Sequence, residues 1–399
     1  MTTLGRATTL SPNETFASAP KRPLNTVLLC TLSLLAIGLL MMTSASVEIA
    51  SSRTGDSLYY LKRQGVFAIL GFVAAGITLA LPLAVWRRFA LLLMLVSFVL
   101  LVAVLIPGIG KTVNGSARWI DLGFFNLQPS ELGKLFIVMY LADYLARNHT
   151  AVRENWREFF IPLAISSVAA GLLQREPDHG ALVILLATTF CLLFLAGAKI
   201  LRLATLVAIA IGGFTAIAFT KPHVLARFTS FTDPWSIENV YGDGYQLAQS
   251  LIAFGRGEWF GTGLGNSIQK LYFLPEAHTD FVLAIIGEEF GLAGVAVVVV
   301  LFCVLVARAF AIGRQAENQG SLFAAYFAYG LGLLFAGQAL INIGVNIGLL
   351  PTKGLTLPFI SSGGASLIVS CVMAAMLIRV QFETERLAAT AKPAQGWGL

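Results

Sequence analysis

Charged side chains are scarce in this sequence: Asp, Glu, Lys and Arg together make up 12% of its 399 residues. Soluble globular proteins carry about 25% charged residues, whereas 57% of this chain is hydrophobic. Too few side chains are available to face water, which excludes a soluble globular domain as the main architecture. The net charge of +6 is modest. We interpret it as orientation in a membrane and contact with lipid, and we expect no nucleic-acid partner.

Cysteine is also rare, and we expect no secretory leader. The four cysteines lie far apart within apolar runs. This spacing favours packing residues over a disulfide framework or a metal site. The first 24 residues are polar and lack the apolar core and cleavage site of a signal peptide. We therefore expect residues 1–24 to form a disordered cytoplasmic tail.

Long apolar runs dominate the rest of the chain. A helix needs about 20 apolar residues to cross the hydrocarbon layer. Ten stretches qualify: 25–47, 64–82, 89–107, 130–147, 159–175, 180–198, 203–219, 280–307, 321–344 and 362–380. We predict an all-α, polytopic integral membrane protein of about ten transmembrane helices. Its membrane domain would cover residues 25–380, followed by a cytoplasmic tail over 381–399.

Lys and Arg in the connections predict the orientation, because short cytoplasmic loops are enriched in both. Arg87 and Arg88 lie between the second and third predicted spans, and Arg308 and Arg314 lie between the eighth and ninth. This places the N-terminus in the cytoplasm, and an even number of spans returns the C-terminus there. The outer side then receives the loops 107–129, 220–279 and 346–361. Long loops gathered on one face usually carry function, so we expect any chemistry on the outer face.

Two polar clusters flank the middle spans. Glu131 and Lys134 are three residues apart and therefore share one helix face, with Ser130 as a possible N-cap. They form either an ion pair at a helix start or a polar wall of a substrate cavity. Arg118 lies upstream, at the interface or facing a pyrophosphate. The second cluster, around Asp178 and His179, is typical of the outer end of a tight hairpin, and a lone histidine near carboxylates is weak evidence for a metal.

Asp280 lies where the longest outer loop enters a predicted span. The positive end of that helix should favour the ionised carboxylate, which can act as a general base at the mouth of a membrane cavity. The alternative is that Thr279 or Asp280 caps the helix. Glu288 lies about 12 Å further along the axis. Because paired glycosidase carboxylates are about 5–9.5 Å apart, Asp280 would act without a partner acid and would need a good leaving group.

The outer loop before Asp280 is rich in glycine and aromatic residues, with polar side chains such as Gln246 and Lys270 between them. Aromatic rings and amides are typical of a sugar-binding surface. An amphipathic loop with its rings at the lipid headgroups would look the same. None of the glycines forms a P-loop, so nucleotide hydrolysis has no support.

The last outer loop leads into a helix start at Ser361–Gly364, a ready anion site, and Lys353 is its only cation. Proline and glycine interrupt the helix here, which is tolerated at membrane depth against a cavity. A phosphate group is the natural ligand. Ordinary loop chemistry is the alternative.

These stretches resemble the shape, elongation, division and sporulation (SEDS) family. The similarity covers nearly the whole membrane region and is most specific over residues 246–289 and 342–364. The polar N-terminal segment and the sequence of residues 275–280 resemble the branch of the family that acts in cell division. His179 stands where the family more often has an apolar residue. Ser362 and Ala365 depart from the family's usual Ser-Tyr-Gly-Gly-Ser-Ser motif.

The resemblance implies peptidoglycan glycosyl transfer from lipid II at the outer face of the bacterial inner membrane. It makes Asp280 the essential acidic residue. The remaining predicted site residues bind substrate; they are Arg63, Glu131, Lys134, Asp178, Gln246, Lys270, His278, Lys353 and Ser361. No protein-bound metal site is predicted, although a divalent cation, Mg²⁺ or Mn²⁺, would help to offset the pyrophosphate charge.

The resemblance also implies partners: membrane lipid, a class B penicillin-binding transpeptidase of the FtsI type, and other division proteins at the septum. Two further hypotheses stay open on the residues alone. A lipid II flippase would suit ten spans with intramembrane charges, although it needs a route open to both faces. A non-catalytic scaffold of the division machinery would not need Asp280.

Overall fold

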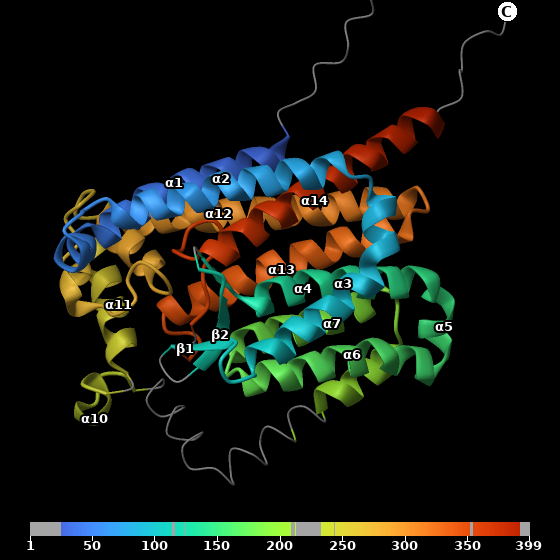
Figure 1. Ribbon diagram of the computed structural model, residues 1–399, viewed down its shortest axis with the longest axis horizontal. Helices are drawn as coiled ribbons and strands as arrows, with labels where there is room; N and C mark the ends of the chain where they lie inside the picture. The colour runs from blue at the N-terminus through green and yellow to red at the C-terminus, as the bar shows by residue number, and fades with distance from the viewer. Residues whose placement is uncertain are drawn as a thin grey trace, which may run out of the picture.

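The computed structural model is a bundle of long helices that lie roughly side by side (Figure 1). The structure describes residues 25–113, 116–123, 125–208, 212, 233–242, 244–351 and 354–391. A small sheet and the short helices α10 and α11 gather at one end of the bundle, which we call the loop end. Helix α5 lies at the opposite end, which we call the α5 end.

The long helices are α1 (Thr26–Thr54), α2 (Tyr59–Ala80), α3 (Leu83–Val104), α4 (Pro129–Arg147), α6 (Trp156–Arg175), α7 (His179–Leu195), α12 (Val282–Asn318), α13 (Leu322–Asn346) and α14 (Gly364–Ala391). The shorter ones are α5 (His149–Glu154), α10 (Ile237–Val240), α11 (Tyr245–Gly257) and the π-helical turn η1 (Gln269–Phe273). Within the described residues, seven helices are long and apolar enough to cross a membrane, and α7 is a shorter apolar helix. The predicted class, an all-α polytopic membrane protein, is confirmed.

Some helices begin or end at other residues than the predicted spans. Helix α4 coincides with the predicted span 130–147, but it begins at Pro129, with Gln128 and not Ser130 as N-cap. Proline is favoured at the first helical position because its missing N–H has no partner there. The predicted span 203–219 lies mostly outside the described residues. Helix α14 continues to Ala391, so the first part of the predicted tail 381–399 is helical.

The predicted outer loop 107–129 contains a small antiparallel sheet. Its strands are β1 (Gly110–Val113), β2 (Ser116–Asp121) and β3 (Asn126–Leu127), in the order β1-β2-β3. Gly110 pairs with Ile120, and Ile120 in turn pairs with Leu127. The sequence signal for this hairpin is the Asn-Gly dipeptide between β1 and β2, which is typical of two-residue turns.

Helix α12 is 37 residues long and is interrupted at Gly291, whose φ of 67° lies in the left-handed region. Segment 258–263 of the outer loop lies against this break. The backbone N–H groups of Leu292 and Ala293 donate to the carbonyls of Glu258 and Trp259, at 2.9 and 3.1 Å. The break therefore satisfies its backbone groups within the protein, as an interrupted helix at membrane depth requires.

All four cysteines are free, as predicted. Cys30 and Cys371 are buried, which agrees with the interpretation as packing residues. Cys303 is exposed on α12, so it does not pack in the core. In a membrane protein an exposed apolar position faces lipid, and a thiol there has no strong polar group to satisfy.

Candidate active site

Asp280 lies at the loop end, in the turn directly before α12, and is half-buried. Its backbone carbonyl accepts hydrogen bonds from the Nδ2 atoms of Asn342 and Asn346 on α13, both at 2.9 Å. Phe281 occupies the N-cap position of α12, and the backbone N–H of Ala284 in the first turn donates to Oδ1 of Asn346 on α13 at 3.2 Å. The alternative that Thr279 or Asp280 is a capping residue is therefore wrong. The Asp280 carboxylate is free for another role.

The surroundings of this carboxylate disfavour its charge. Burial, followed by the nearby carboxylate of Glu276, raises the pKa of Asp280 to about 7, and the guanidinium of Arg118 partly opposes this. We expected the helix end to favour the ionised form. That expectation is wrong because the loss of water outweighs the helix dipole, which acts only near the first turn. A base of this pKa is poised to accept a proton near neutral pH.

Arg118 on β2 is the cation beside Asp280. Its Nε donates to the carbonyl of Glu176 at 3.3 Å, and its Nη2 donates to the carbonyl of Pro177. The connection between α6 and α7 thus holds the guanidinium in place. The Glu176 carboxyl is buried without a hydrogen-bond partner among the described residues, and burial raises its pKa to about 8. A mostly neutral Glu176 leaves the Arg118 charge available to Asp280.

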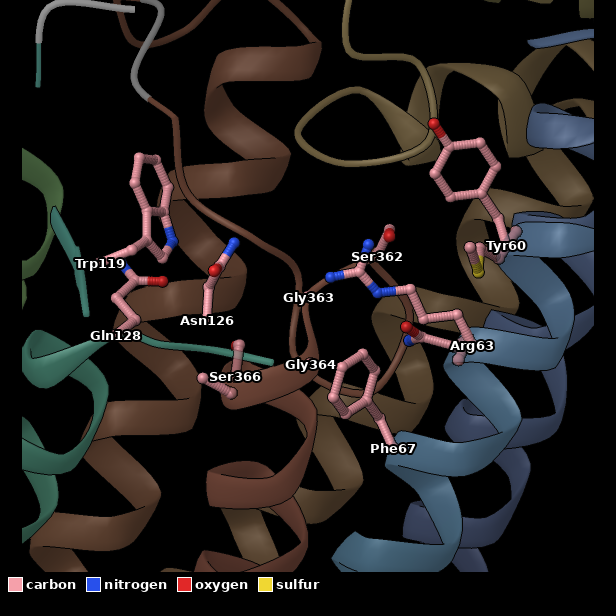
Figure 2. Close-up of a pocket in the computed structure, with 13 residues that line it drawn as sticks. Tyr60, Arg63, Phe67, Trp119, Asn126, Gln128, Ser362, Gly363, Gly364 and Ser366 are labelled. Carbon is pink, nitrogen blue, oxygen red and sulfur yellow. The ribbon is translucent and has the colours of Figure 1, made fainter. Parts of the chain in front are cut away.

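A cavity of about 180 Å³ opens on the neighbouring side of this site. Figure 2 shows Trp119, Asn126 and Gln128 on one wall, and Tyr60, Arg63 and Phe67 of α2 on the other. The segment from Ser362 to Ser366, which leads into α14, lies between them, and Arg63 reaches towards Ser362 and Gly363. A cation and a helix N-terminus that share one cavity favour an anion. The predicted anion site at the start of α14 and the predicted Arg63 therefore come together.

His278 connects this cavity with Asp280. Its carbonyl accepts a hydrogen bond of 2.9 Å from the backbone N–H of Ser362, and its ring lies 5.3 Å from that of Tyr60. Burial lowers the pKa of His278, which keeps the ring neutral. Among the described residues Asp280 is not part of the cavity wall. It follows His278 by two residues, and His278 contacts Ser362 and Tyr60 of that wall.

Comparison with known proteins gives the family. A sequence model of the FtsW, RodA and SpoVE proteins, described as "Cell cycle protein", matches residues 25–386. This chain belongs to the SEDS family. It is 49% identical to a Pseudomonas fluorescens protein named "Probable peptidoglycan glycosyltransferase FtsW", with 88% of this chain and 86% of the relative covered. A Coxiella burnetii protein of the same name is 47% identical and covers 90% of this chain, with 96% of its own length covered.

Solved structures share the fold. A chain from a study of the structural coordination of polymerization and crosslinking by a peptidoglycan synthase complex has a TM-score of 0.74 and 27% identity, with 90% of this chain and 97% of that chain covered. Thermus thermophilus rod shape determining protein RodA has a TM-score of 0.65 and 25% identity, with 90% and 96% covered. The SEDS fold therefore extends over nearly the whole described membrane region.

Several predicted substrate-binding residues of this SEDS protein have partners within the protein. Lys134 and Glu131 form a buried ion pair of 2.8 Å, and Gln338 donates to the second Glu131 oxygen. Asp178 accepts from Ser130 at 2.8 Å and caps α7 through the backbone N–H of Ala181. Both clusters thus have structural contacts, and direct contact of Glu131, Lys134 and Asp178 with substrate stays a prediction.

The remaining predicted residues are dispersed. Ser361 is buried and its Oγ accepts from the backbone N–H of Leu357 at 2.8 Å, which shapes the loop before α14. Gln246 is half-buried in the first turn of α11. Lys353 lies outside the described residues. Direct contact of these three side chains with substrate stays a prediction.

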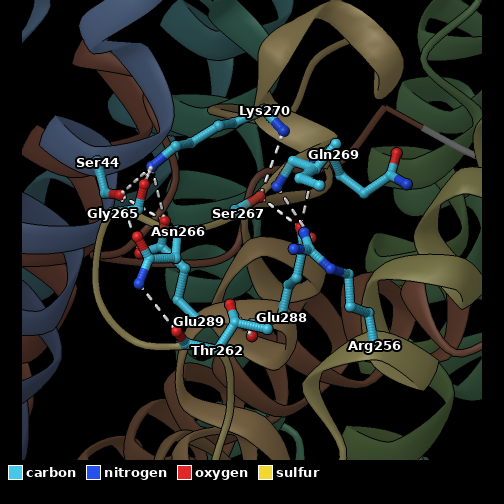
Figure 3. Close-up of polar contacts among 11 residues, drawn as sticks. Ser44, Arg256, Thr262, Gly265, Asn266, Ser267, Gln269, Lys270, Glu288 and Glu289 are labelled. Carbon is cyan, nitrogen blue, oxygen red and sulfur yellow. Dashed lines mark hydrogen bonds and ion pairs between the residues drawn. The ribbon is translucent and has the colours of Figure 1, made fainter.

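Lys270 belongs to a network beside α12 that the sequence did not predict (Figure 3). Its Nζ lies 2.8 Å from Glu289 and also donates to Ser44 at 3.0 Å. Next to it, Glu288 pairs with Arg256 at 2.6 Å and accepts from the backbone N–H of Ile268 at 2.9 Å. The two carboxylates fasten η1 and the preceding loop to α12. Glu288 is thus paired with Arg256 and is not available as a partner acid for Asp280.

The side chains that the structure describes do not by themselves form a metal centre. Among the described residues no three His, Cys, Asp or Glu side chains are close enough together to hold an ion. A divalent cation would take most of its ligands from substrate phosphates and water, as Mg²⁺ commonly does.

Gly354 leaves room for the Asp280 carboxylate. A Cβ at position 354 would lie 3.0 Å from Asp280 Oδ2 and 3.7 Å from Arg118 Nη1. Gly354→Ala should therefore displace the carboxylate while the fold persists, and lower glycan polymerisation by about tenfold or more, because small misplacements of a reacting group are costly. Initial rates with labelled lipid II test this. Gly65→Ala, where an added Cβ meets nothing within 4 Å, is the matched control.

Proposed function

We propose that this chain polymerises lipid II into glycan strands at the outer face of the bacterial inner membrane, as the peptidoglycan glycosyltransferase of septal wall synthesis. The observation that carries the proposal is the pairing of a half-buried carboxyl of pKa about 7, Asp280, with an adjoining cavity that contains Arg63 and the start of α14. The first group suits proton removal from an alcohol, and the second suits a phosphate group.

Asp280 is the general base in this proposal. It removes the proton from the 4-hydroxyl of the acceptor GlcNAc, and that oxygen attacks the anomeric carbon of the donor MurNAc with inversion. The bond between that carbon and the pyrophosphate oxygen breaks, and undecaprenyl pyrophosphate leaves with the electron pair. Because a pyrophosphate departs without protonation, a second carboxylic acid is not needed, in keeping with the engagement of Glu288 by Arg256.

Arg63 and the N-terminus of α14 stabilise the departing charge in this proposal. Fixed donors aimed at a developing anion act without reorganisation during the reaction. Trp119, Asn126 and Gln128 on the opposite wall add an aromatic ring and amides suited to a sugar. Trp119 and Arg118 are neighbours on β2, where successive side chains point to opposite faces. One strand can thus contribute to the cavity on one side and to Asp280 on the other.

Purified full-length protein in vesicles, supplied with labelled lipid II, tests the function. We expect glycan polymers to form when lipid II is added to the side of the vesicle membrane on which the loop end lies. A parallel assay measures movement of lipid II between leaflets. Movement without polymer would favour the flippase, and neither activity would favour a scaffold. Repeating the reaction with a chelator, and with a class B penicillin-binding transpeptidase of the FtsI type, tests the proposed cation and partner.

The pKa of Asp280 predicts the pH dependence. A general base works in its deprotonated form, so the rate should be low below the pKa and rise through about pH 7. An unperturbed aspartate, with a pKa near 3.9, would instead give a flat rate across this range. Initial polymerisation rates between pH 5.5 and 8.5 distinguish the two. Arg118→Gln should move the midpoint upward, because the guanidinium lowers the Asp280 pKa.

A further inference from the structure

A second cavity, of about 470 Å³, lies between the first turns of α3 and the last turn of α4. Helix α5 follows α4 almost immediately, so this cavity is at the α5 end, opposite Asp280 (Figure 1). The cavity is lined by Ala84, Arg87, Arg88, Leu91, Asp143 and Arg147. Nothing in the proposed transfer reaction uses these residues.

The cavity has an excess of positive charge. Asp143 is buried and pairs with Arg87 at 2.7 Å and with Arg147 at 2.9 Å. Both arginines keep about half of their side-chain surface exposed, 45% and 52%. Arg88 has no ion-pair partner among the described residues. Three guanidinium groups thus face one carboxylate, which leaves the equivalent of two positive charges for a ligand.

The wall of the cavity continues into an apolar stripe along α3. Leu91, Leu95, Val99 and Val102 follow Arg88 at spacings of three or four residues, so they share one helix face. All four side chains are exposed, with exposed fractions of 47–66%. The stripe extends about 21 Å from Arg88 to Val102. This is longer than the roughly 15 Å of one leaflet's hydrocarbon, so the stripe spans that leaflet and reaches into the next.

We propose that this cavity binds the phosphate headgroup of an anionic phospholipid, with the acyl chains along the stripe from Leu91 to Val102. Guanidinium groups bind phosphate oxygens through paired, charge-assisted hydrogen bonds. A water-soluble phosphate compound would gain from the arginines alone, whereas a lipid gains from both the arginines and the stripe. Basic pockets between membrane helices are the expected sites for such headgroups. The orientation predicted from Lys and Arg places this end at the cytoplasmic leaflet.

Binding of a fluorescent phosphatidylglycerol to full-length protein in neutral detergent tests the proposal. Each arginine near an anionic headgroup is worth about fivefold in affinity. We therefore expect Arg88→Gln to weaken binding about fivefold, and Arg88→Gln with Arg147→Gln about 25-fold. Arg87 is kept so that Asp143 retains a partner. Because Arg88 has no ion pair to lose, the single variant should fold even if the double variant does not.

Arg157→Gln is the matched control, since Arg157 is an exposed residue in the first turn of α6, outside the cavity. It should leave the affinity unchanged. Competition separates the possible sources of phosphate: unlabelled phosphatidylglycerol should displace the probe, whereas phosphatidylethanolamine and millimolar inorganic phosphate should not. Equal binding by Arg88→Gln, or displacement by inorganic phosphate, would overturn the proposal. Loss of lipid II polymerisation plays no part in this readout, so failure of the proposed function would not affect it.

Discussion

Asp280→Asn should give a folded protein that no longer polymerises lipid II. The fold should persist because the two hydrogen bonds that anchor residue 280, from Asn342 and Asn346, end on its backbone carbonyl and not on the carboxylate. The replacement amide cannot accept a proton at neutral pH. Positioned general bases contribute about 10²–10⁴-fold to a rate, so polymerisation should fall by a factor in this range.

The experiment compares initial rates of polymer formation from labelled lipid II, together with thermal unfolding of each variant. Asp121→Asn is the matched control: this aspartate also lies at the loop end, on β2, but it forms an exposed ion pair with Lys111. Exposed pairs contribute about 0–1 kcal/mol, so this variant should retain full activity and stability. If Asp280→Asn polymerises at more than about a tenth of the wild-type rate, Asp280 is not the base.

The pH profile adds an independent check on the same carboxyl. If Asp280→Asn is inactive but the wild-type rate does not change through about pH 7, then Asp280 acts by binding substrate and not by accepting a proton. Both results together are needed to assign the base. Each can fail alone, because one concerns the presence of the carboxylate and the other concerns its protonation.

The long helices were predictable from the sequence because each carries apolar side chains over a membrane-spanning length, whereas the short helices α5, α10 and α11 were not predicted. Even α4, which carries Glu131, Lys134 and Asp143, could be predicted, since its charges are balanced by neighbours within reach. The sheet was not predicted: its strands have four, six and two residues. Such lengths are too short for a two-residue periodicity to be distinguished from a loop.

The site was only partly predictable. Asp280 was identified from its place before a predicted span as well as from the resemblance, whereas Arg63 came from the resemblance alone. In the structure Asp280 lies beside the cavity whose wall contains Arg63. Arg118 was considered but not assigned to Asp280, because a β-strand brings it there from a distant part of the chain. Asp178 and Glu131 have the residue types of a polar cavity, yet they are buried with partners. Residue type alone does not distinguish a buried pair from a binding group; that depends on which side chains meet in three dimensions.

Lys270 and Glu289 provide the second large expected effect. Lys270→Met would leave Glu289, which is fully buried, without its cation at 2.8 Å. Removing one member of a buried ion pair costs about 3–5 kcal/mol. We expect the free energy of unfolding to fall by that amount, measured by thermal or denaturant unfolding in detergent. Lys62→Met is the control, because the Lys62–Asp56 pair is exposed, at 67% and 43%; it should change stability by less than about 1 kcal/mol.

The double variant Lys270→Met with Glu289→Met decides between the two roles considered for Lys270. Replacing both members of a buried pair with apolar side chains is often neutral or stabilising, so stability should return to near the wild-type value. If Lys270 only fastens η1 to α12, polymerisation should return with stability. If Lys270 binds lipid II, as the sequence predicted, the stable double variant should stay inactive. Because Lys270 also donates to Ser44 on α1 and to the carbonyl of Gly265, the network joins three segments of the loop end. We therefore expect recovery of both properties.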